Sequence, residues 1–169
     1  MRDNQQEKVE MSTDTTIHIT HWGSQGPRVV MIHGSAQGSK IGGDRHFESQ
    51  KALAEQGWQL LVPDRPGHGR SASPGRPDDA ELDGVWVAEM LADGAHLVGH
   101  SFGGAVALAA AARRPEAVHS LTLIEPALQP VAISRPEVRK FILSILLNRF
   151  TSFTTAQRAR GFAKLMRIP

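Results

Sequence analysis

Residues 99–104 read GHSFGG, so a single serine is surrounded by three glycines. Ser101 stands where an apolar run ends and an alanine-rich run begins, and this pattern predicts a strand that passes directly into a helix. A nucleophilic serine needs this setting, because a sharp turn exposes its hydroxyl and leaves backbone N–H groups usable beside it. Glycine two residues before and two residues after the serine avoids a collision between strand and helix. The spacing therefore indicates covalent acyl-transfer chemistry, and a plain helix N-cap is the alternative.

The elements needed to hold such a turn are visible in the sequence. Continuous apolar runs, which are typical of strands covered on both faces, occur at 29–34, 59–64, 95–101 and 118–126. Stretches with helical character separate them, at about 46–56, 78–92 and 102–113. Strands that alternate with helices predict a parallel sheet with right-handed crossovers. Residues 16–23 alternate between apolar and polar side chains, and they predict an antiparallel edge strand with a second strand near 8–13.

The pattern changes after Glu125, where two amphipathic helices are expected. The first starts at Ser134 and Glu137, which have capping-box spacing, and its apolar stripe is formed by Val138, Phe141, Ile142, Ile145 and Leu146. The second starts near Thr154 and Gln157. We therefore expect a polar tail at 1–7, an α/β core at 8–130 and a helical segment at 131–169.

Composition narrows the classes of function. The chain has 169 residues, of which 40% are apolar and 21% charged, as in a globular domain. It contains no cysteine, which excludes a disulfide scaffold, a cysteine nucleophile and a thiolate metal site, and which fits a cytoplasmic location. No signal peptide, membrane-spanning run, histidine pair with metal spacing or nucleic-acid-binding module is recognisable. We expect no metal and no cofactor.

Charge is distributed unevenly along the chain. Through Ser134 there are 11 basic against 16 acidic residues, whereas from Arg135 onward there are 8 against 1. A solvated basic face on the terminal helices is one interpretation, and a surface that attracts an anionic substrate or partner is the other.

Together with three other motifs, the serine motif resembles the α/β-hydrolase superfamily. VVMIHGS at 29–35 resembles the family's third strand with its His-Gly oxyanion loop, and VPDRPGHGRSAS at 62–73 resembles the loop after its fourth strand. LTLIEPAL at 121–128 resembles its sixth strand, after which many members insert a helical cap. The likeness covers about residues 8–169 and only the amino-terminal part of the family's fold. It implies an α/β, mostly parallel sheet that is incomplete at its carboxy-terminal side, followed by the start of a cap at 131–169.

The resemblance also implies roles for individual residues. Ser101 corresponds to the nucleophile, and the backbone N–H groups of Phe102 and Ser35 correspond to the two halves of the oxyanion hole. The residues that support these motifs are His33, Gly34, Gly99, His100, Gly103 and Gly104. The implied reaction is hydrolysis of a carboxylic ester through an acyl-enzyme, on a small molecule with an apolar portion. Lactonase, C–C hydrolase and cofactor-free perhydrolase activities stay open as alternatives.

A histidine base is the part of the family's pattern that the chain lacks. The family carries it near the carboxy terminus, whereas no histidine follows His119 here. Glu125 matches the strand end where some members carry their catalytic acid, and capping of a loop is the alternative. We therefore expect residues 1–169 alone to be inactive, and the competing class is a non-catalytic fragment or degenerate hydrolase that binds a ligand or partner. The strand at 118–126 is then an exposed edge, which favours self-association or pairing with a complementary chain.

Overall fold

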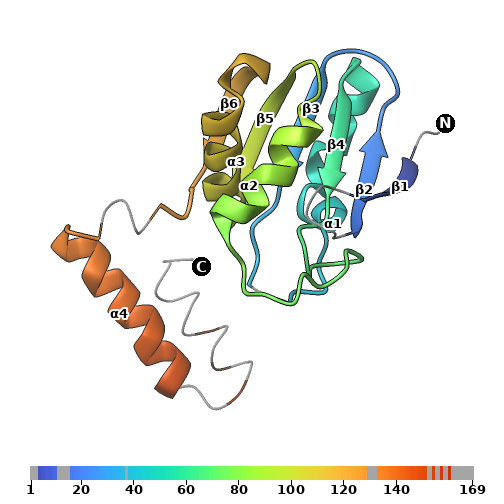
Figure 1. The fold of residues 1–169 in the computed structure, drawn as a ribbon. Helices are drawn as coiled ribbons and strands as arrows, with labels where there is room; N and C mark the ends of the chain where they lie inside the picture. The colour runs from blue at the N-terminus through green and yellow to red at the C-terminus, as the bar shows by residue number, and fades with distance from the viewer. Residues whose placement is uncertain are drawn as a thin grey trace. The chain divides into compact units, whose positions relative to one another are not determined.

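The computed structural model describes residues 4–10, 16–36, 38–128 and 133–151, together with Thr154, Gln157 and Arg160. The chain divides into two compact units, Met1–Ala127 and Leu128–Pro169. The first unit is a six-stranded sheet with helices on both of its faces, and the second contains one long helix (Figure 1).

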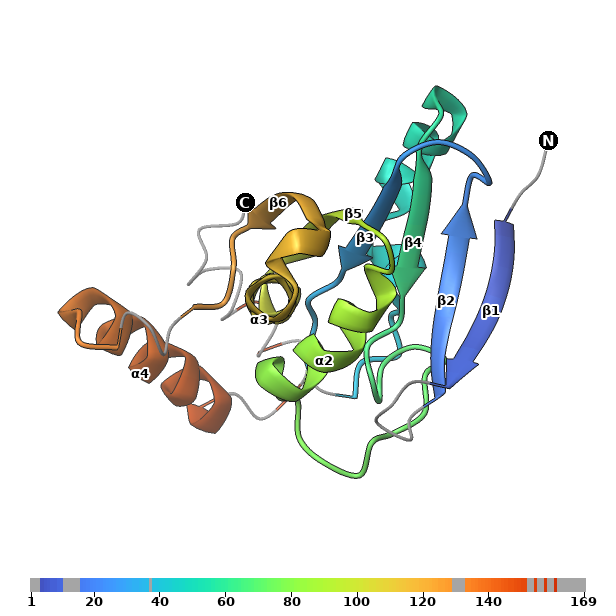
Figure 2. The ribbon, with the colours of Figure 1, turned by 45° about the horizontal axis from the view of Figure 1, so that its top comes forward.

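The sheet of the first unit is a mixed sheet with its parallel part in the centre and at one side. Its strands are β1 (Asn4–Glu10), β2 (Thr16–Trp22), β3 (Arg28–Ile32), β4 (Gln59–Pro63), β5 (Ala95–His100) and β6 (Val118–Ile124). Their order in the sheet is β1-β2-β4-β3-β5-β6 (Figure 2). The pairs β4/β3, β3/β5 and β5/β6 are parallel, and the pairs that involve β2 are antiparallel. The predicted α/β fold class and the four apolar strands are confirmed.

Each face of this sheet is buried against its own helices. Alternate residues of β3 face opposite sides, so Val30 and Ile32 join one apolar cluster while Val29 and Met31 join another. The first cluster includes residues of α2 (Ala80–Met90) and α3 (Phe102–Arg113). The second packs against α1 (Gly43–His46) and the 3₁₀ segment η1 (Glu48–Gln56). The continuous apolar runs in the sequence arise from this two-sided burial.

The amino-terminal segment differs from the prediction in two ways. The polar tail expected at 1–7 does not match, because β1 already begins at Asn4. The strand at Thr16–Trp22 is not an edge either, since β1 covers one of its sides and β4 the other. The second strand predicted near 8–13 overlaps β1 at residues 8–10, and the rest of that range lies outside the described residues. β1 begins earlier than predicted because the exposed polar residues 5–8 pair with β2 through the backbone.

The second unit contains α4 (Pro136–Thr151), which agrees with the first of the two expected helices. Of the predicted apolar stripe, Phe141 and Ile142 are half-buried, while Ile145 and Leu146 are exposed. Most of the second expected helix lies outside the described residues. Its predicted cap is visible, since Thr154 and Gln157 exchange side chain–backbone hydrogen bonds of 2.9 and 3.1 Å. No helix within the described ranges is long and apolar enough to cross a membrane.

Candidate active site

Ser101 lies at the junction between β5 and α3, in a backbone conformation that serine rarely adopts. Its φ is 53° and its ψ is −123°, which is outside the extended region typical of a helix N-cap. Although Ser101 occupies the N-cap position of α3, its side chain makes no capping hydrogen bond. No described residue hydrogen-bonds to its Oγ atom. The hydroxyl is therefore not used as a cap, and it is available for chemistry.

The glycines around Ser101 are explained by the close approach of strand and helix. A Cβ atom on Gly99 would lie 2.5 Å from the carbonyl oxygen of Gly103 and 2.8 Å from the Cβ atom of Ala107. A Cβ atom on Gly103 would overlap the carbonyl oxygen of Ile32 and lie 2.6 Å from that of His33. Both glycines are needed for space rather than for a positive φ, as expected for a turn of this kind.

Strained backbone is concentrated at the carboxyl ends of three neighbouring strands. Ser35 follows β3 with φ 97°, Ser101 follows β5, and Glu125 follows β6 with φ 43°. Among the described non-glycine residues, Ala92 alone has a positive φ elsewhere. Such conformations cost about 1–3 kcal/mol each, and they persist where the surrounding structure enforces them, often at functional sites. The sheet order β3-β5-β6 brings these three strand ends to one edge.

Two backbone amides beside Ser101 lack partners within the described part of the chain. These are the N–H groups of Ser35 and Phe102, for which no described acceptor lies in hydrogen-bond geometry. Gly34 brings the two segments together, because a Cβ atom built on Gly34 would lie 3.3 Å from Ser101 Oγ. A backbone N–H on each side of the serine is the arrangement that can stabilise a developing oxyanion.

His33 is a neutral histidine whose two ring nitrogens are both used to hold the loop after β3. The backbone N–H of Arg65 donates to His33 Nε2 at 3.0 Å, so Nε2 is the acceptor and the proton resides on Nδ1. Nδ1 then donates to the carbonyl of Gly34 at 2.5 Å. Burial of the ring, followed by the Arg65 cation, lowers the pKa of His33 to about 3. His33 therefore supports the loop after β3 and cannot take a proton from Ser101 without losing these bonds.

The buried neutral state of His33 predicts a pH dependence of stability. In the unfolded chain its imidazole takes up a proton near pH 6.5, whereas in the folded chain it stays neutral until about pH 3. Neutral His33 therefore makes its full contribution to the free energy of unfolding above about pH 6.5. That free energy falls as the pH is lowered, by about 3 kcal/mol between pH 6.5 and pH 4. Urea unfolding at pH 7, 5.5 and 4 measures the slope.

The matched variants for this experiment are His33→Asn and His119→Asn, since Asn can still donate to the Gly34 carbonyl. The first should be less stable at pH 7 but show a flatter pH dependence. The second changes an exposed histidine and should keep the wild-type slope. A wild-type slope in His33→Asn would contradict the neutral, fully bonded state of this ring.

The other histidines do not reach Ser101 either, and all eight lie in described residues. His100 Nδ1 and His46 Nε2 form a mutual hydrogen bond of 2.7 Å, and burial, then the proximity of His100, lowers the pKa of His46. His68 is buried, and its Nδ1 atom lies 3.0 Å from the carbonyl oxygen of Pro66. The remaining four lie on strands, His18 and His21 on β2, His96 near the start of β5 and His119 near the start of β6.

The backbone on either side of Glu125 is hydrogen-bonded to Ser101, whereas the Glu125 carboxylate is not. The N–H of Ser101 donates to the carbonyl of Ile124 at 2.9 Å, and the N–H of Ala127 donates to the carbonyl of Ser101 at 2.9 Å. These two bonds flank Glu125 and fix its strained backbone. Its side chain is exposed, and among the described residues it has no hydrogen-bond or ion-pair partner. The structure thus brings Glu125 to the site but does not join it to a histidine.

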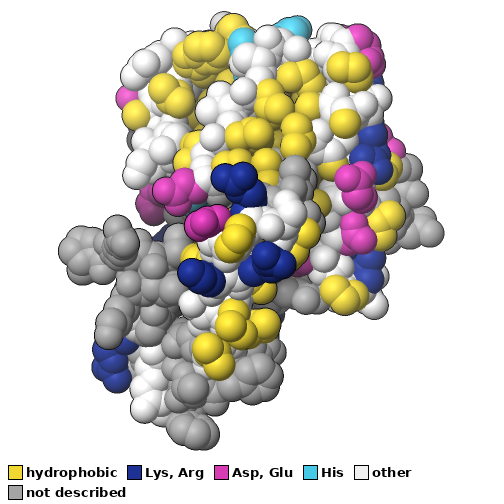
Figure 3. Space-filling model, turned by 90° about the vertical axis from the view of Figure 1, so that its left-hand side faces the viewer, with side chains coloured by type: hydrophobic (Ala, Val, Ile, Leu, Met, Phe, Trp, Pro, Cys, Tyr) yellow, Lys and Arg dark blue, Asp and Glu magenta, His cyan; other side chains and the backbone are white. Residues whose placement is uncertain are grey.

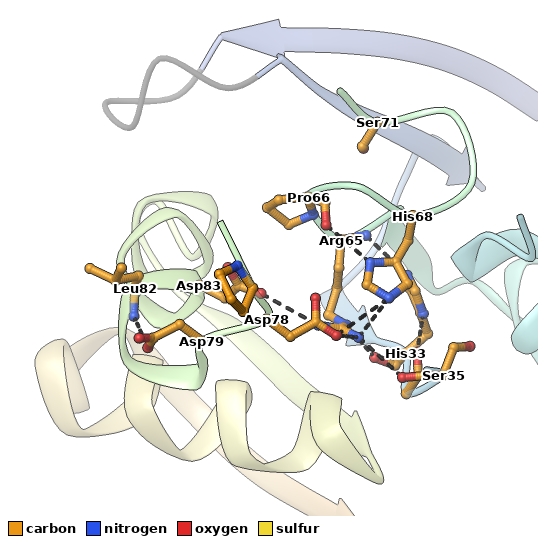
Figure 4. Close-up of polar contacts among 12 residues, drawn as sticks. His33, Ser35, Arg65, Pro66, His68, Ser71, Asp78, Asp79, Leu82 and Asp83 are labelled. Carbon is orange, nitrogen blue, oxygen red and sulfur yellow. Dashed lines mark hydrogen bonds and ion pairs between the residues drawn. The ribbon is translucent and has the colours of Figure 1, made fainter. Parts of the chain in front are cut away.

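Sequence analysis missed the polar network under the site, which is drawn in Figure 4. Its centre is Arg65, a fully buried cation in the loop after β4, with Asp78 and Asp83 as ion-pair partners at 3.3 and 3.4 Å. The signal was present, because an aspartate and an arginine directly follow an apolar strand in the 62–73 motif. Within the described residues no group of three His, Asp or Glu side chains could hold a metal ion.

Residues 27–165 match a protein family described as the alpha/beta hydrolase fold. Among characterised relatives, the chain is 36% identical over 134 residues to a protein named Lipase LipV from Mycobacterium tuberculosis, covering 77% of this chain and 48% of that protein. It is 34% identical over 121 residues to a 2-hydroxy-6-oxononadienedioate/2-hydroxy-6-oxononatrienedioate hydrolase from Burkholderia vietnamiensis, covering 69% of this chain and 42% of that protein. The chain thus spans less than half the length of these relatives.

Solved structures with a similar fold match about the same share of this chain. An esterase from Exiguobacterium antarcticum superposes with a TM-score of 0.61 at 28% identity, covering 72% of this chain and 46% of the esterase. A thioesterase domain from the curacin biosynthetic pathway superposes with a TM-score of 0.59 at 30% identity, covering 74% of this chain and 45% of that domain.

Proposed function

Because the chain belongs to the alpha/beta hydrolase family, we propose that Ser101 is the nucleophile of a serine hydrolase that acts on carboxylic esters through an acyl-enzyme. The observation that carries this proposal is a strained serine whose side chain caps nothing, placed between two backbone amides without described partners. A structural serine at a helix start would use its hydroxyl as the cap. The partial positive charge at the start of α3 adds to the stabilisation of negative charge beside Ser101.

The proposed reaction has two steps. Ser101 Oγ attacks the ester carbonyl, and the carbonyl oxygen becomes an oxyanion held by the N–H groups of Ser35 and Phe102. Collapse of this intermediate releases the alcohol and leaves the acyl group on Ser101, which water then removes. Both steps need a base that takes the proton of the attacking hydroxyl. Glu125 is proposed as the carboxylate that would orient such a base, since it follows β6 at the same edge as Ser101.

The names of the relatives support a small-molecule substrate and differ in the bond that is broken. A lipase name favours an ester of a fatty acid, and a 2-hydroxy-6-oxo-dienedioate hydrolase name favours cleavage of a carbon–carbon bond. We propose the ester because, once a base is supplied, its acyl group can be carried on Ser101 Oγ beside the two backbone amides. A substrate with an apolar portion is proposed, and the helical segment at 131–169, which contains α4, is proposed as the start of a cap.

A substrate panel tests this proposal on the full-length gene product. We expect p-nitrophenyl esters to be hydrolysed, Ser101→Ala to abolish the activity, and Glu125→Gln to lower kcat. Turnover of a 2-hydroxy-6-oxohexa-2,4-dienoate without ester hydrolysis would replace the ester by a carbon–carbon substrate. Absence of turnover on both, with ligand binding unchanged in Ser101→Ala, would support a non-catalytic binding protein instead.

The edge of the sheet is proposed as a surface for self-association. β6 is the outermost described strand on its side, and His119, Ser120, Thr122 and Ile124 on it are exposed. On this side of the molecule hydrophobic side chains form a band in the upper part of Figure 3. Unpaired backbone groups on an exposed strand favour pairing with another chain. Residues 1–169 in isolation are therefore expected to form oligomers.

Size-exclusion chromatography with light scattering measures this directly. Thr122→Lys places a charge on the exposed edge and should shift the isolated chain toward monomer. Ser49→Lys makes the same change on the surface of η1 and should leave the oligomers unchanged. A sharp monomer peak for the wild-type chain, with a cooperative thermal transition, would show that the sheet needs no partner at β6.

A further inference from the structure

We propose that Arg65 is a positioning residue that fixes the two oxyanion-hole amides relative to each other, an inference that rests on the proposed roles of Ser35 and Phe102. Arg65 follows β4 and is completely buried. Its guanidinium lies between the loop after β3 and the start of α3, and Figure 4 shows it among the side chains and carbonyls that it contacts.

On the β3 side, Arg65 and His33 together bind three consecutive carbonyl groups. Arg65 Nε donates to the carbonyl of His33 at 3.0 Å, and Nη2 lies 3.5 Å from the carbonyl of Ser35. The carbonyl between them, that of Gly34, accepts from His33 Nδ1, and the opposite side of that ring accepts from the Arg65 backbone N–H. Every carbonyl from His33 to Ser35 is therefore bound directly or indirectly by Arg65.

These bonds determine the direction of the Ser35 N–H. The carbonyl of Gly34 and the N–H of Ser35 belong to one planar trans peptide, so they point in opposite directions. Because His33 binds the carbonyl, the N–H must point away from the His33 ring. This orientation comes with a φ of 97° at Ser35, which is costly for a residue other than glycine. The bonds from Arg65 and His33 hold the carbonyls of residues 33–35, and His68 Nε2 lies 3.1 Å from the next carbonyl, that of Ala36.

On the α3 side, Arg65 contacts the residue that carries the second amide. Its Cζ atom lies 4.6 Å from the centroid of the Phe102 ring, within the range of a cation–π interaction. Phe102 is the first residue of α3, so a fixed ring restrains the backbone that presents its N–H. One guanidinium thus spans both halves of the proposed oxyanion hole.

Charge neutralisation alone does not account for an arginine at this place. Arg65 is balanced by Asp78 and Asp83, and Asp83 also accepts from Arg76 at 2.7 Å. Buried ion networks of this kind are often no more stable than apolar side chains of similar volume. The planar fork of arginine can bind the Ser35 carbonyl and face the Phe102 ring at once, whereas lysine offers one point charge. Geometry rather than stability is therefore the property that Arg65 contributes.

The test compares Arg65→Lys and Arg65→Met with Arg70→Met in the full-length protein. Arg70 is a matched control, because it is an ion-paired arginine of the same loop, bound to Asp64 and Asp44 at 3.0 Å. The two Arg65 variants should lower kcat for p-nitrophenyl butyrate by about 10²-fold, as for loss of one oxyanion donor, with KM within about 3-fold. Arg70→Met should keep kcat within about 3-fold. If Arg65→Met does not fold, Arg65→Met combined with Asp78→Asn removes the carboxylate that loses its arginine partner, since Asp83 keeps Arg76 at 2.7 Å.

A second readout does not depend on activity. NMR order parameters of the Ser35 and Phe102 amides should be near 0.85 in the wild type and fall below about 0.6 in both Arg65 variants but not in Arg70→Met. Wild-type kcat and order parameters in Arg65→Lys would overturn the inference, because charge would then suffice. Failure of the proposed function gives a different result from failure of this inference. Ser101→Ala would then retain activity, while the amide order parameters would still report on Arg65.

Discussion

Residues 1–169 on their own are expected to hydrolyse p-nitrophenyl acetate at a negligible rate, roughly 10⁴-fold or more below a serine hydrolase with a complete triad. The physical reason is that the hydroxyl of Ser101 is a weak nucleophile until a base accepts its proton. All eight histidines lie in described residues, and none hydrogen-bonds to Ser101 Oγ. An oxyanion hole without a base gives only about 10³–10⁴-fold over water in serine proteases.

Initial rates with Ser101→Ala as the blank measure this expectation. Turnover at the level of ordinary esterases, lost in Ser101→Ala, would show that a histidine of this chain does serve as the base. His46→Asn and His33→Asn would identify it, since both rings lie near the strand ends that carry Ser35 and Ser101. The mutual bond of His46 and His100 would then have to break during the reaction.

Replacing Gly103 with valine is expected to destabilise the core unit by about 3 kcal/mol, the upper end of the usual cost of overpacking. The new Cβ atom would overlap the backbone carbonyls of Ile32 and His33 at the end of β3. Backbone carbonyls of a central strand cannot rotate away as a flexible side chain can, so α3 must shift. Such a loss is a large part of the 5–15 kcal/mol that stabilises a typical domain.

Chemical denaturation of Gly103→Val and Ala112→Val separates this clash from the helix propensity of valine. Ala112 is an exposed residue of the same helix, where valine costs only about 0.5 kcal/mol. Equal destabilisation of the two variants would mean that the strand and helix can separate at Gly103, and the steric explanation of the glycine would be wrong.

The fold and the serine turn could be predicted because their causes are local. Each central strand is buried on both faces, so it appears as an apolar run, and the strand–helix contact at Gly99 and Gly103 needs glycine at fixed spacing. The resemblance to a known family identified Ser35 and Phe102 as candidates for the oxyanion hole. Their side chains give no signal in the sequence, because the proposed functional group is the backbone N–H. The strand–helix turn predicted at Ser101 lies between β5 and α3 in the structure.

Other features depend on contacts that sequence spacing does not encode. Arg65 and Asp83 are 18 positions apart, and their pairing arises only when α2 packs over the loop after β4. Residues 5–8 of β1 are polar and exposed, so hydropathy placed this strand near 8–13 and did not reveal that it begins at Asn4. The bond between His46 and His100 crosses 54 positions, and it joins two rings that looked unrelated in the sequence.

The central claim is that Ser101 is the nucleophile beside an oxyanion hole, and covalent labelling of the full-length gene product with a fluorophosphonate probe tests it most directly. The full-length gene product is treated with the probe, digested, and the adduct is located by peptide mass mapping. We predict a single phosphonylated residue, Ser101, and no labelling in Ser101→Ala. An adduct on another residue, or undiminished labelling of Ser101→Ala, would contradict the assignment of Ser101 as the nucleophile.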